Sequence, residues 1–495
     1  MSTMGSGQGG VTVVQAAPAR LDREGLAGLG IPFLLPLIEH LHALQARPSE
    51  RTGRWFQRDL IGQGFFEVPS AWTGEPVRTR QSVLLRDKSV VYLFDGEPDL
   101  WLGAGSLGDG CPVNSVFIPS RRLFLNLGHE VWGARPEQVL GAERILAAMG
   151  HAPPAGDGAR VTVVSGDPSF AHHVWNQLGA LDRLAAEGWR DRRLDLVVTH
   201  EPLGPIRGLF ADCQGWTVTH CFEHALEELN APGRLFVPLG GALVTRGARE
   251  RLFRHVAALP GTAPLPRHPR GWRFWISIRT RNRTAANQIE FLTALCQALG
   301  AAYPGCEVIL DGHSLAEDND RLMALGDRSN LAIAAADLAV ADAVAAGLRR
   351  RRRVRVTKAV GLRISQSLTL ARGCDFYVCH HGTVQHKIGW FTDVPGIAHS
   401  NREITLADPA PSVAGHVEGG VAPVYLPERL IGELGPRVEG DALAAELRHD
   451  GYVVTALEEA CAFIVAEAGR HVPPAPPGLW QRLRGRLRRL GRVPP

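Results

Sequence analysis

Between Gly373 and Asn401 an apolar run ends against proton-active and cationic side chains, in the segment GCDFYVCHHGTVQHKIGWFTDVPGIAHSN. Asp375–Cys379 has the length and the aromatic and β-branched content of a buried strand. The chain must turn after it, and a helix capped by Thr383 is expected to follow. Helix N-termini favour anions, and open α/β sheets bind ligands at the carboxyl ends of their strands. The phosphate-binding set expected here is His381, Gly382, Thr383 and Lys387. The alternative is a loop whose histidines are only hydrogen-bonded.

Two further strand ends carry side chains that suit a bound phosphate. A strand expected from Arg273 to Ile278 runs into Arg279–Arg283, and a strand expected from Glu307 to Asp311 runs into His313. Guanidiniums bind phosphate through charge-assisted hydrogen bonds. The binding residues expected at these ends are Arg279, Arg283, Asn287 and His313. The alternatives are a solvated loop for the arginines and a plain turn around His313.

An earlier strand end carries candidate proton acceptors. A strand expected over Val161–Val164 leads past Asp167 into a helix that bears His172 and His173. The unperturbed pKa of histidine, near 6.5, suits it to take a proton from an acceptor hydroxyl. We expect His173 to be the general base, with His172 second and Asp167 third. The alternative is a helix start with one core and one surface histidine.

These segments together resemble glycosyltransferase family 61. WISIRTRNRTAANQIEFL (275–292), CEVILDGHSL (306–315) and SQSLTLARGCDFYVCHHG (365–382) are similar, in that order, to the second half of such proteins. FAHHVWNQLGALDRL (170–184) looks like the family's His-Trp-bearing helix. The resemblance covers residues 160–400 and implies a GT-B fold, a nucleotide-sugar donor and inverting, metal-independent transfer. The chain differs in having Gly382-Thr383 where the family has Gly-Ala-Gly, and Gln385-His386-Lys387 near the family's usual Asn.

The order of expected elements predicts an α/β protein with two Rossmann-like domains facing across a cleft. Residues 1–155 read as an α+β lead-in subdomain with a disordered N-terminus, containing an expected helix over Leu26–Gln45. Strands and helices alternate over 156–262, the expected acceptor domain, and again over 263–472, the expected donor domain, which ends in a helix expected from Tyr452. Residues 473–495 read as a Pro-rich linker and a basic tail.

Composition bounds the class of protein. The 495 residues are 45% hydrophobic, no secretory leader is recognised, and Leu331–Leu348 is expected to be a packed helix because aspartates interrupt it. Eight scattered cysteines without a CxxC pair indicate reduced thiols in a cytoplasmic protein. His220 and His224 are expected on one helix face near Cys213 and Cys221, but their spacing fits no zinc pattern, so no metal is expected.

Charge is local. The net charge of +4 is too small to predict nucleic-acid binding. Of 54 basic residues only Lys88, Lys358 and Lys387 are lysines, so a retained lysine can mark a place that needs a compact ammonium. The tail Leu479–Arg492 places Trp480 and leucines on one stripe and arginines elsewhere, which favours an interfacial helix on anionic lipid. The alternative is a simple solvated tail.

The sequence thus predicts a cytoplasmic glycosyltransferase that can rest on the inner membrane face. It would move a sugar from a nucleotide-sugar donor, which is a substrate, to a glycan or lipid-linked acceptor in bacterial surface polysaccharide synthesis, and no cofactor is expected. Two rival hypotheses stay open. One is a pyruvyl or other non-sugar transferase on the same architecture. The other is a catalytically degenerate binding or scaffold protein.

Overall fold

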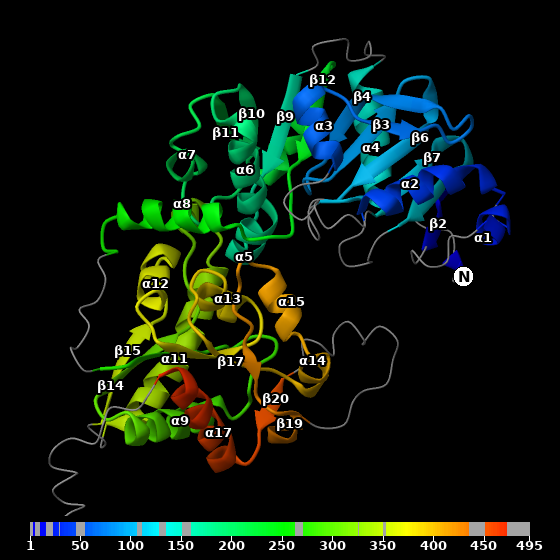
Figure 1. Cartoon of the computed structure of the whole chain (residues 1–495). Coiled ribbons are helices and arrows are strands. Elements are labelled where there is room, and N and C mark those ends of the chain that lie inside the picture. The colour runs from blue at the N-terminus through cyan, green and yellow to red at the C-terminus, as the bar shows by residue number, and fades with distance from the viewer. Residues whose placement is uncertain are drawn as a thin grey trace, which may run out of the picture. The chain divides into compact units, whose positions relative to one another are not determined.

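A computed structural model describes most of the chain (Figure 1). The described residues are 3–4, 10–15, 23–28, 30–45, 55–105, 111–127, 135–150, 160–262, 271–324, 326–349, 353–434 and 451–472. The chain divides into two compact units, Met1–His255 and Val256–Pro495. The tail predicted to bind lipid lies outside the described residues.

The first unit begins with an eight-stranded sheet of order β1-β2-β8-β7-β6-β5-β4-β3, antiparallel except for the parallel pair β2 and β8. Its strands are β1 (Thr3–Met4), β2 (Thr12–Gln15), β3 (Glu67–Pro69), β4 (Pro76–Leu84), β5 (Val90–Phe94), β6 (Glu97–Ala104), β7 (Val113–Ile118) and β8 (Leu123–Asn126). The short helix η5 (Pro119–Arg121) joins the last two strands. Edge-to-face packing of Phe66 on Tyr92 and Phe94 fills the core beside it.

Helices of this part are α1 (Arg23–Gly28), η3 (Pro32–Leu34), α2 (Leu35–Gln45), α3 (Trp55–Gln63) and α4 (Pro136–Met149). The single helix expected over Leu26–Gln45 is wrong. The chain breaks at Gly30, whose φ is +70°, and Pro32 then starts a separate 3-10 turn.

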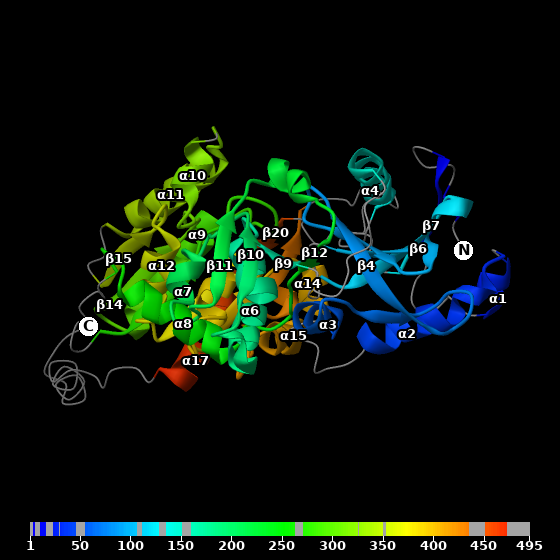
Figure 2. The ribbon, with the colours of Figure 1, turned by 90° about the horizontal axis from the view of Figure 1, so that it is seen from above.

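A four-stranded parallel sheet completes the first unit, in the order β11-β10-β9-β12 (Figure 2). Its strands are β9 (Arg160–Ser165), β10 (Leu194–Val198), β11 (Trp216–His220) and β12 (Arg234–Pro238). The helical segments around it are α5 (Phe170–His172), the π-helical η6 (His173–Leu178), α6 (Gly179–Leu184), the π-helical η7 (Ala185–Trp189), α7 (Ile206–Leu209), the 3-10 helix η8 (Glu223–Leu229) and α8 (Arg246–Ala257). The expectation of alternating strands and helices here is confirmed.

The second unit holds a six-stranded sheet of order β15-β14-β13-β16-β17-β18, in which every adjacent pair is parallel. The strands are β13 (Arg273–Ser277), β14 (Cys306–Asp311), β15 (Val354–Ala359), β16 (Phe376–His380), β17 (Gly396–His399) and β18 (Val424–Tyr425). Counted from β13, this is the order 3-2-1-4-5-6 of doubly wound nucleotide-binding sheets. The chain is therefore a mixed α/β protein with parallel sheets.

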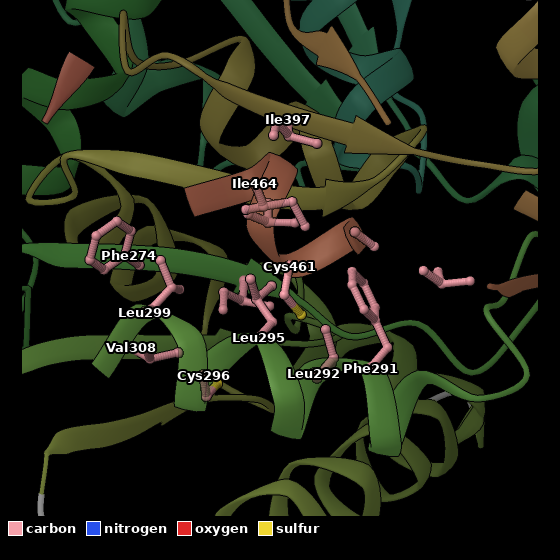
Figure 3. Close-up of a cluster of buried hydrophobic side chains, with 14 of the residues drawn as sticks. Phe274, Phe291, Leu292, Leu295, Cys296, Leu299, Val308, Ile397, Cys461 and Ile464 are labelled. Atoms are coloured by element: carbon pink, nitrogen blue, oxygen red, sulfur yellow. The ribbon is translucent and has the colours of Figure 1, made fainter. Parts of the chain in front are cut away.

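Helices cover the six-stranded sheet, and a small sheet of β19 (Ile431–Glu433) and β20 (Tyr452–Val454) lies beside them. The helices are α9 (Gln288–Ala302), α10 (Asn319–Ala324), α11 (Ser329–Leu348), α12 (Ile364–Ala371), α13 (Thr383–Gly389), α14 (Arg402–Leu406), α15 (Ala410–Gly415), η9 (Glu428–Leu430) and α17 (Leu457–His471). Leucines of α9 and the Cys461–Ile464 face of α17 pack on Phe274 in one core (Figure 3). The helix expected from Tyr452 starts later, because Tyr452 belongs to β20.

Within the described residues, α11 is the one helix long and apolar enough to cross a membrane by length and composition. Its Ala341, Val344 and Leu348 are buried in the same core as α9. The sequence-based expectation of a packed helix fits this contact.

Candidate functional site

The candidate site lies where the strand order of the second unit reverses. Strands β13 and β16 are paired there, with Ile276 opposite Val378. The strands that follow β13 in the chain lie on one side of this pair, and those that follow β16 lie on the other side. Doubly wound sheets bind ligands in the crevice at this switch point, outside the carboxyl ends of the strands. The segment after β13 carries Arg279 and Arg283, and the segment after β16 carries His381 and Gly382. The structure therefore brings these four predicted residues together.

Both guanidiniums lie against Gly382. A Cβ built on Gly382 would be 3.3 Å from Nη1 of Arg283 and 3.4 Å from Nη1 of Arg279. Gly382 also has φ of +100°, which L side chains rarely adopt. Arg279 is held by its Nη1 donating to the carbonyl of His381 at 3.2 Å, and by Nε and Nη2 donating to Asn282 at 2.5 and 2.6 Å. Glycine is therefore required where the two cations meet the strand exit.

Among the described residues, neither arginine forms an ion pair with a carboxylate, although the charge of Asp337 acts on Arg279 from further away. Burial and, after it, the neighbouring charge of Arg283 lower the pKa of Arg279 to about 10. Burial also lowers the pKa of Arg283, whose buried Nε has no hydrogen-bond partner. Two partly buried like charges destabilise each other unless an opposite charge lies between them. The arrangement favours an anionic ligand.

His381 belongs to the same cluster. Its Nδ1 lies 2.5 Å from the hydroxyl of Tyr425 on β18. Burial, Arg283, Arg279 and His416, in that order, lower the pKa of His381 to about 3. The imidazole is therefore neutral near pH 7 in the free protein. Tyr425 stays a neutral phenol because burial raises its pKa.

The expectation that Thr383 caps the following helix is wrong. Gly382 occupies the N-cap position of α13, and no side chain caps the helix there. Since α13 has 7 residues, its dipole is short, and the carbonyl of Gly382 already accepts from the amides of Gln385 and His386. The preference for an anion comes from the guanidiniums.

Lys387 is not directed at a ligand. Its Nζ donates to Oδ1 of Asp311 at 2.5 Å, to the carbonyl of Gly312 at 2.6 Å and to Oγ of Ser314 at 3.1 Å. These contacts use all three ammonium hydrogens, and the side chains of Lys387 and Asp311 are 2% and 0% exposed. Burial raises the pKa of Asp311, and Lys387 opposes that shift. Lys387 ties α13 to the end of β14, so the predicted contact with the diphosphate has no hydrogen left to form it.

Asn287 and His313 also have structural partners. The side-chain amide of Asn287 donates to the carbonyl of Val454 at 2.8 Å and accepts from its amide at 3.1 Å, which fastens α9 to β20. His313 donates its backbone amide to Asp337 at 2.7 Å, and its Nε2 lies 3.2 Å from Asn330. Their predicted binding role stays a prediction.

A buried layer below the arginines was missed in the sequence. The rings of His380 and His399 lie 4.4 Å apart, and their Nδ1 atoms contact Ser277 at 3.0 Å and Tyr452 at 2.5 Å. Burial lowers the pKa of both histidines, and neither Nε2 has a hydrogen-bond partner. No local motif marks Tyr452 and Tyr425 as site residues. Strand pairing that no motif shows brings them to this edge, so the sequence could not reveal their contacts with the histidines.

In the first unit, Asp167, His172 and His173 follow the end of β9. His173 is 0% exposed, and its Nδ1 lies 3.1 Å from Oε1 of Gln177, which also accepts from the amide of Gly166 at 2.8 Å. That second contact makes Gln177 the acceptor, so His173 carries its proton on Nδ1. Burial lowers the pKa of His173 to about 4, and its Nε2 is unpartnered. This geometry suits a structural role better than a general base.

The two other candidates differ in accessibility. His172 is half-buried, with Nδ1 3.2 Å from Oδ1 of Asn176. Asp167 is buried and accepts from the amide of Ser169 at 2.8 Å. A catalytic role for any of the three stays a prediction.

The same edge of the first unit holds Lys88, one of the three retained lysines, together with Glu223 and His200, which were not predicted to lie near it. Lys88 donates to Oε1 of Glu223 at 2.8 Å and to the carbonyl of Gly166 at 2.9 Å, and His200 Nε2 lies 3.5 Å from Glu223. Hydrogen bonding to His200 and the charge of Lys88 lower the pKa of Glu223 to about 2. Lys88 lies in the turn between β4 and β5, far in sequence from Glu223 and His200, so no short motif could reveal this group.

The predicted shared helix face of His220 and His224 is wrong. His220 ends strand β11, with Nδ1 3.5 Å from Glu201, whereas His224 lies in η8. Among the described residues, no group of three or more His, Cys, Asp or Glu side chains could hold a metal ion.

A cavity of about 480 Å³ lies in the first unit, at the amino ends of β9 and β10. Trp189, Arg160, Arg193 and Asp195 line it together with the turn after α3. Arg160 and Arg193 already pair with Asp195, at 2.7 and 3.8 Å. None of the predicted site residues lines this cavity, so we place the chemistry at the strand exits.

Comparisons with known proteins add little to this geometry. No family model matches the chain, and no curated protein matches it. Among solved structures it is similar to E. coli ADP-heptose lps heptosyltransferase II, with 12% identity over 62% of this chain and 99% of the other, at a TM-score of 0.31. It is also similar to Methanocaldococcus jannaschii UDP-GlcNAc 2-epimerase in complex with UDP-GlcNAc and UDP, with 10% identity over 54% and 89% of the two chains, at a TM-score of 0.24. These likenesses are too weak to carry an argument.

Proposed function

We propose that this protein is a glycosyltransferase whose nucleotide-sugar donor binds at the switch point of the second unit. The observation that carries the proposal is the pair Arg279 and Arg283, two partly buried cations that meet at Gly382 and that form no ion pair with any carboxylate of the described residues. A diphosphate between them supplies the missing negative charge. Arginine also matches phosphate oxygens with two parallel hydrogen bonds.

The same pair suits the chemistry of transfer. When the bond between the sugar and the diphosphate breaks, negative charge develops on the departing oxygen. Fixed guanidiniums in a partly dehydrated site stabilise that charge without reorganisation. From the sequence resemblance to glycosyltransferase family 61 we further propose that the sugar transfer is inverting and metal-independent. In that course the acceptor oxygen attacks directly while a base removes its proton.

For the general base, half-buried His172 is favoured over fully buried His173, and Asp167, which is also buried, stays the third candidate. A base must come within hydrogen-bond reach of the acceptor hydroxyl, and His173 is fully enclosed with a pKa lowered to about 4. We retain a glycan or lipid-linked acceptor and bacterial surface polysaccharide synthesis at the cytoplasmic membrane face as parts of the proposal. These parts rest on the sequence resemblance and the predicted tail.

A thermal-shift screen against nucleotide sugars tests the proposal, because a ligand at 100 times its Kd stabilises a protein by about 2.7 kcal/mol. The donor found is then incubated with acceptor extracts, and release of the nucleoside diphosphate is measured. Binding with release supports a glycosyltransferase. Binding without release favours a degenerate binding protein, and a response only to a non-sugar donor favours the pyruvyl-type alternative.

A further inference from the structure

We propose that His381 takes up a proton when the donor diphosphate binds beside Arg279 and Arg283, and that the resulting imidazolium assists departure of the diphosphate. The inference rests on the proposed donor site and adds a change of charge state to it. It makes donor affinity pH-dependent through one named side chain.

The position of His381 is fixed on several sides. Its backbone amide donates to the carbonyl of His399 at 2.9 Å, and its own carbonyl accepts from Nη1 of Arg279 at 3.2 Å. Its ring nitrogen Nδ1 contacts the Tyr425 hydroxyl at 2.5 Å. The backbone of His381 is therefore fixed beside Arg279, and its ring is held by Tyr425.

The groups that face His381 are all neutral or cationic. Tyr425 approaches from β18, Arg279 and Arg283 from the segment after β13, and His416 from the residue that follows α15. Its neighbour His380 on β16 is buried and contacts Ser277. Among the described residues, none of the groups that act electrostatically on His381 is a carboxylate, although the charge of Asp408 acts on its partner Tyr425. A proton on this ring is repelled by both arginines in the free protein.

A bound diphosphate reverses that balance. The two phosphates of a nucleotide sugar are diesters that carry two negative charges at any pH near neutrality. Burial is the largest cause of the low pKa of His381, and the charges of Arg283 and Arg279 lower it as well. Placed against the two arginines, the diphosphate cancels those charges and its own negative charge attracts the proton to the ring. The pKa of His381 then rises from about 3 toward its unperturbed value of about 6.5. Tyr425 can accept the Nδ1 hydrogen of the imidazolium, since a phenol both donates and accepts.

The acquired proton has a use in transfer. The acceptor oxygen forms a bond to the anomeric carbon, its proton passes to a base, and the bond between that carbon and the diphosphate oxygen breaks. The electron pair of the broken bond stays on the diphosphate, whose negative charge increases by one. The His381 imidazolium donates a charge-assisted hydrogen bond to this oxygen, which lowers the barrier to departure.

Calorimetry of donor binding in two buffers of different ionisation enthalpy measures the proton uptake. The probe is whichever nucleotide sugar stabilises the protein in the thermal-shift screen, because its diester phosphates do not titrate between pH 5 and 8. We expect uptake of about 0.9 proton at pH 5.5, about 0.5 at pH 6.5 and under about 0.1 at pH 8. Binding should correspondingly be about tenfold tighter at pH 5.5 than at pH 8.

Two variants identify the group that takes the proton. His381→Gln keeps a hydrogen-bonding side chain but cannot titrate, so its binding should show neither uptake nor the tenfold pH effect. His416→Gln removes the other nearby histidine and should retain both. Circular dichroism at each pH establishes that each variant is folded before it is titrated.

The outcomes are separable. Donor binding without proton uptake, or uptake that survives in His381→Gln, overturns the inference and leaves the donor site standing. Failure of every nucleotide sugar to bind overturns the proposed function, and the inference with it. Uptake lost only in His381→Gln supports both.

Discussion

Arg283 is the residue whose removal best separates binding from folding. Its guanidinium has no hydrogen-bonded partner at Nε and is repelled by Arg279, so it contributes little to stability. Arg283→Gln should weaken donor binding by about 10- to 150-fold, the equivalent of a charged hydrogen bond of about 1.5–3 kcal/mol. Its melting temperature should stay equal or rise.

Titration of the donor by calorimetry, together with thermal unfolding, checks this. Arg281→Gln is the matched control, because it removes the same charge from an exposed position of the same segment. If Arg281→Gln weakens binding as much as Arg283→Gln does, the effect is general electrostatics and the paired-arginine site is refuted.

Lys387 should behave in the opposite way, as a structural residue. Lys387→Met leaves the buried Asp311 carboxylate without its cation, and breaking such a pair costs about 3–5 kcal/mol. The pKa of Asp311, already raised by burial, should rise further in the variant. A carboxyl whose folded pKa lies above its unfolded value loses stability as pH rises, so the deficit should be larger at pH 8.5 than at pH 5.5.

Urea unfolding of the wild type and variant at the two pH values measures the difference. The double variant Asp311→Leu/Lys387→Met should recover much of the loss, because no buried charge is then left unpaired. A Lys387→Met protein of wild-type stability with weakened donor binding would restore the lysine to the binding site.

At the scale of elements, the turn between β16 and α13 sets the geometry of the site. Gly382→Ala places a Cβ against both guanidiniums at a φ of +100°, so we expect a loss of about 1–3 kcal/mol of stability and a large loss of donor affinity. Gly305→Ala has a φ of +84° and open space around it, and it should cost stability without affecting the donor.

Unfolding and donor titration of the two variants together check this prediction. Equal donor affinity in both would mean that the close approach of the arginines to Gly382 has no part in binding.

Elements with strong local patterns were predictable, and those defined by distant pairing were not. The apolar runs that become β13 and β16 were predicted from the sequence alone. Strand β6 was missed although Asp95-Gly96, a strong hairpin signal, joins it to β5. Strand β20 was taken for helix, because only its pairing with β19 makes Tyr452 part of a strand.

The candidate site shows the same division. Its arginines, Gly382 and His381 follow strand ends, so their meeting could be predicted from the rule that parallel strands end at one edge. The buried ion pair between Lys387 and Asp311 could not be predicted, because a sequence motif does not reveal which partner a buried ammonium contacts.

At the scale of the whole molecule, the predicted tail bears on where the protein works. Residues 479–492 combine an apolar stripe with arginines, each worth about 1 kcal/mol near an anionic surface. A chain truncated before Leu479 should therefore lose binding to anionic vesicles while it retains donor affinity. Co-sedimentation with anionic and zwitterionic vesicles measures this. Equal partitioning of the full-length and truncated chains would make the tail a solvated end.

The fates of the three lysines have a practical consequence for labelling the molecule. The side chains of Lys88 and Lys387 are 9% and 2% exposed, whereas that of Lys358 on β15 is 40% exposed. An amine-reactive dye or coupling resin should thus modify one side chain, Lys358, beside the terminal amine. Among the lysine side chains, a fluorophore or a surface tether should therefore attach at one defined point of the second unit without engineering the chain.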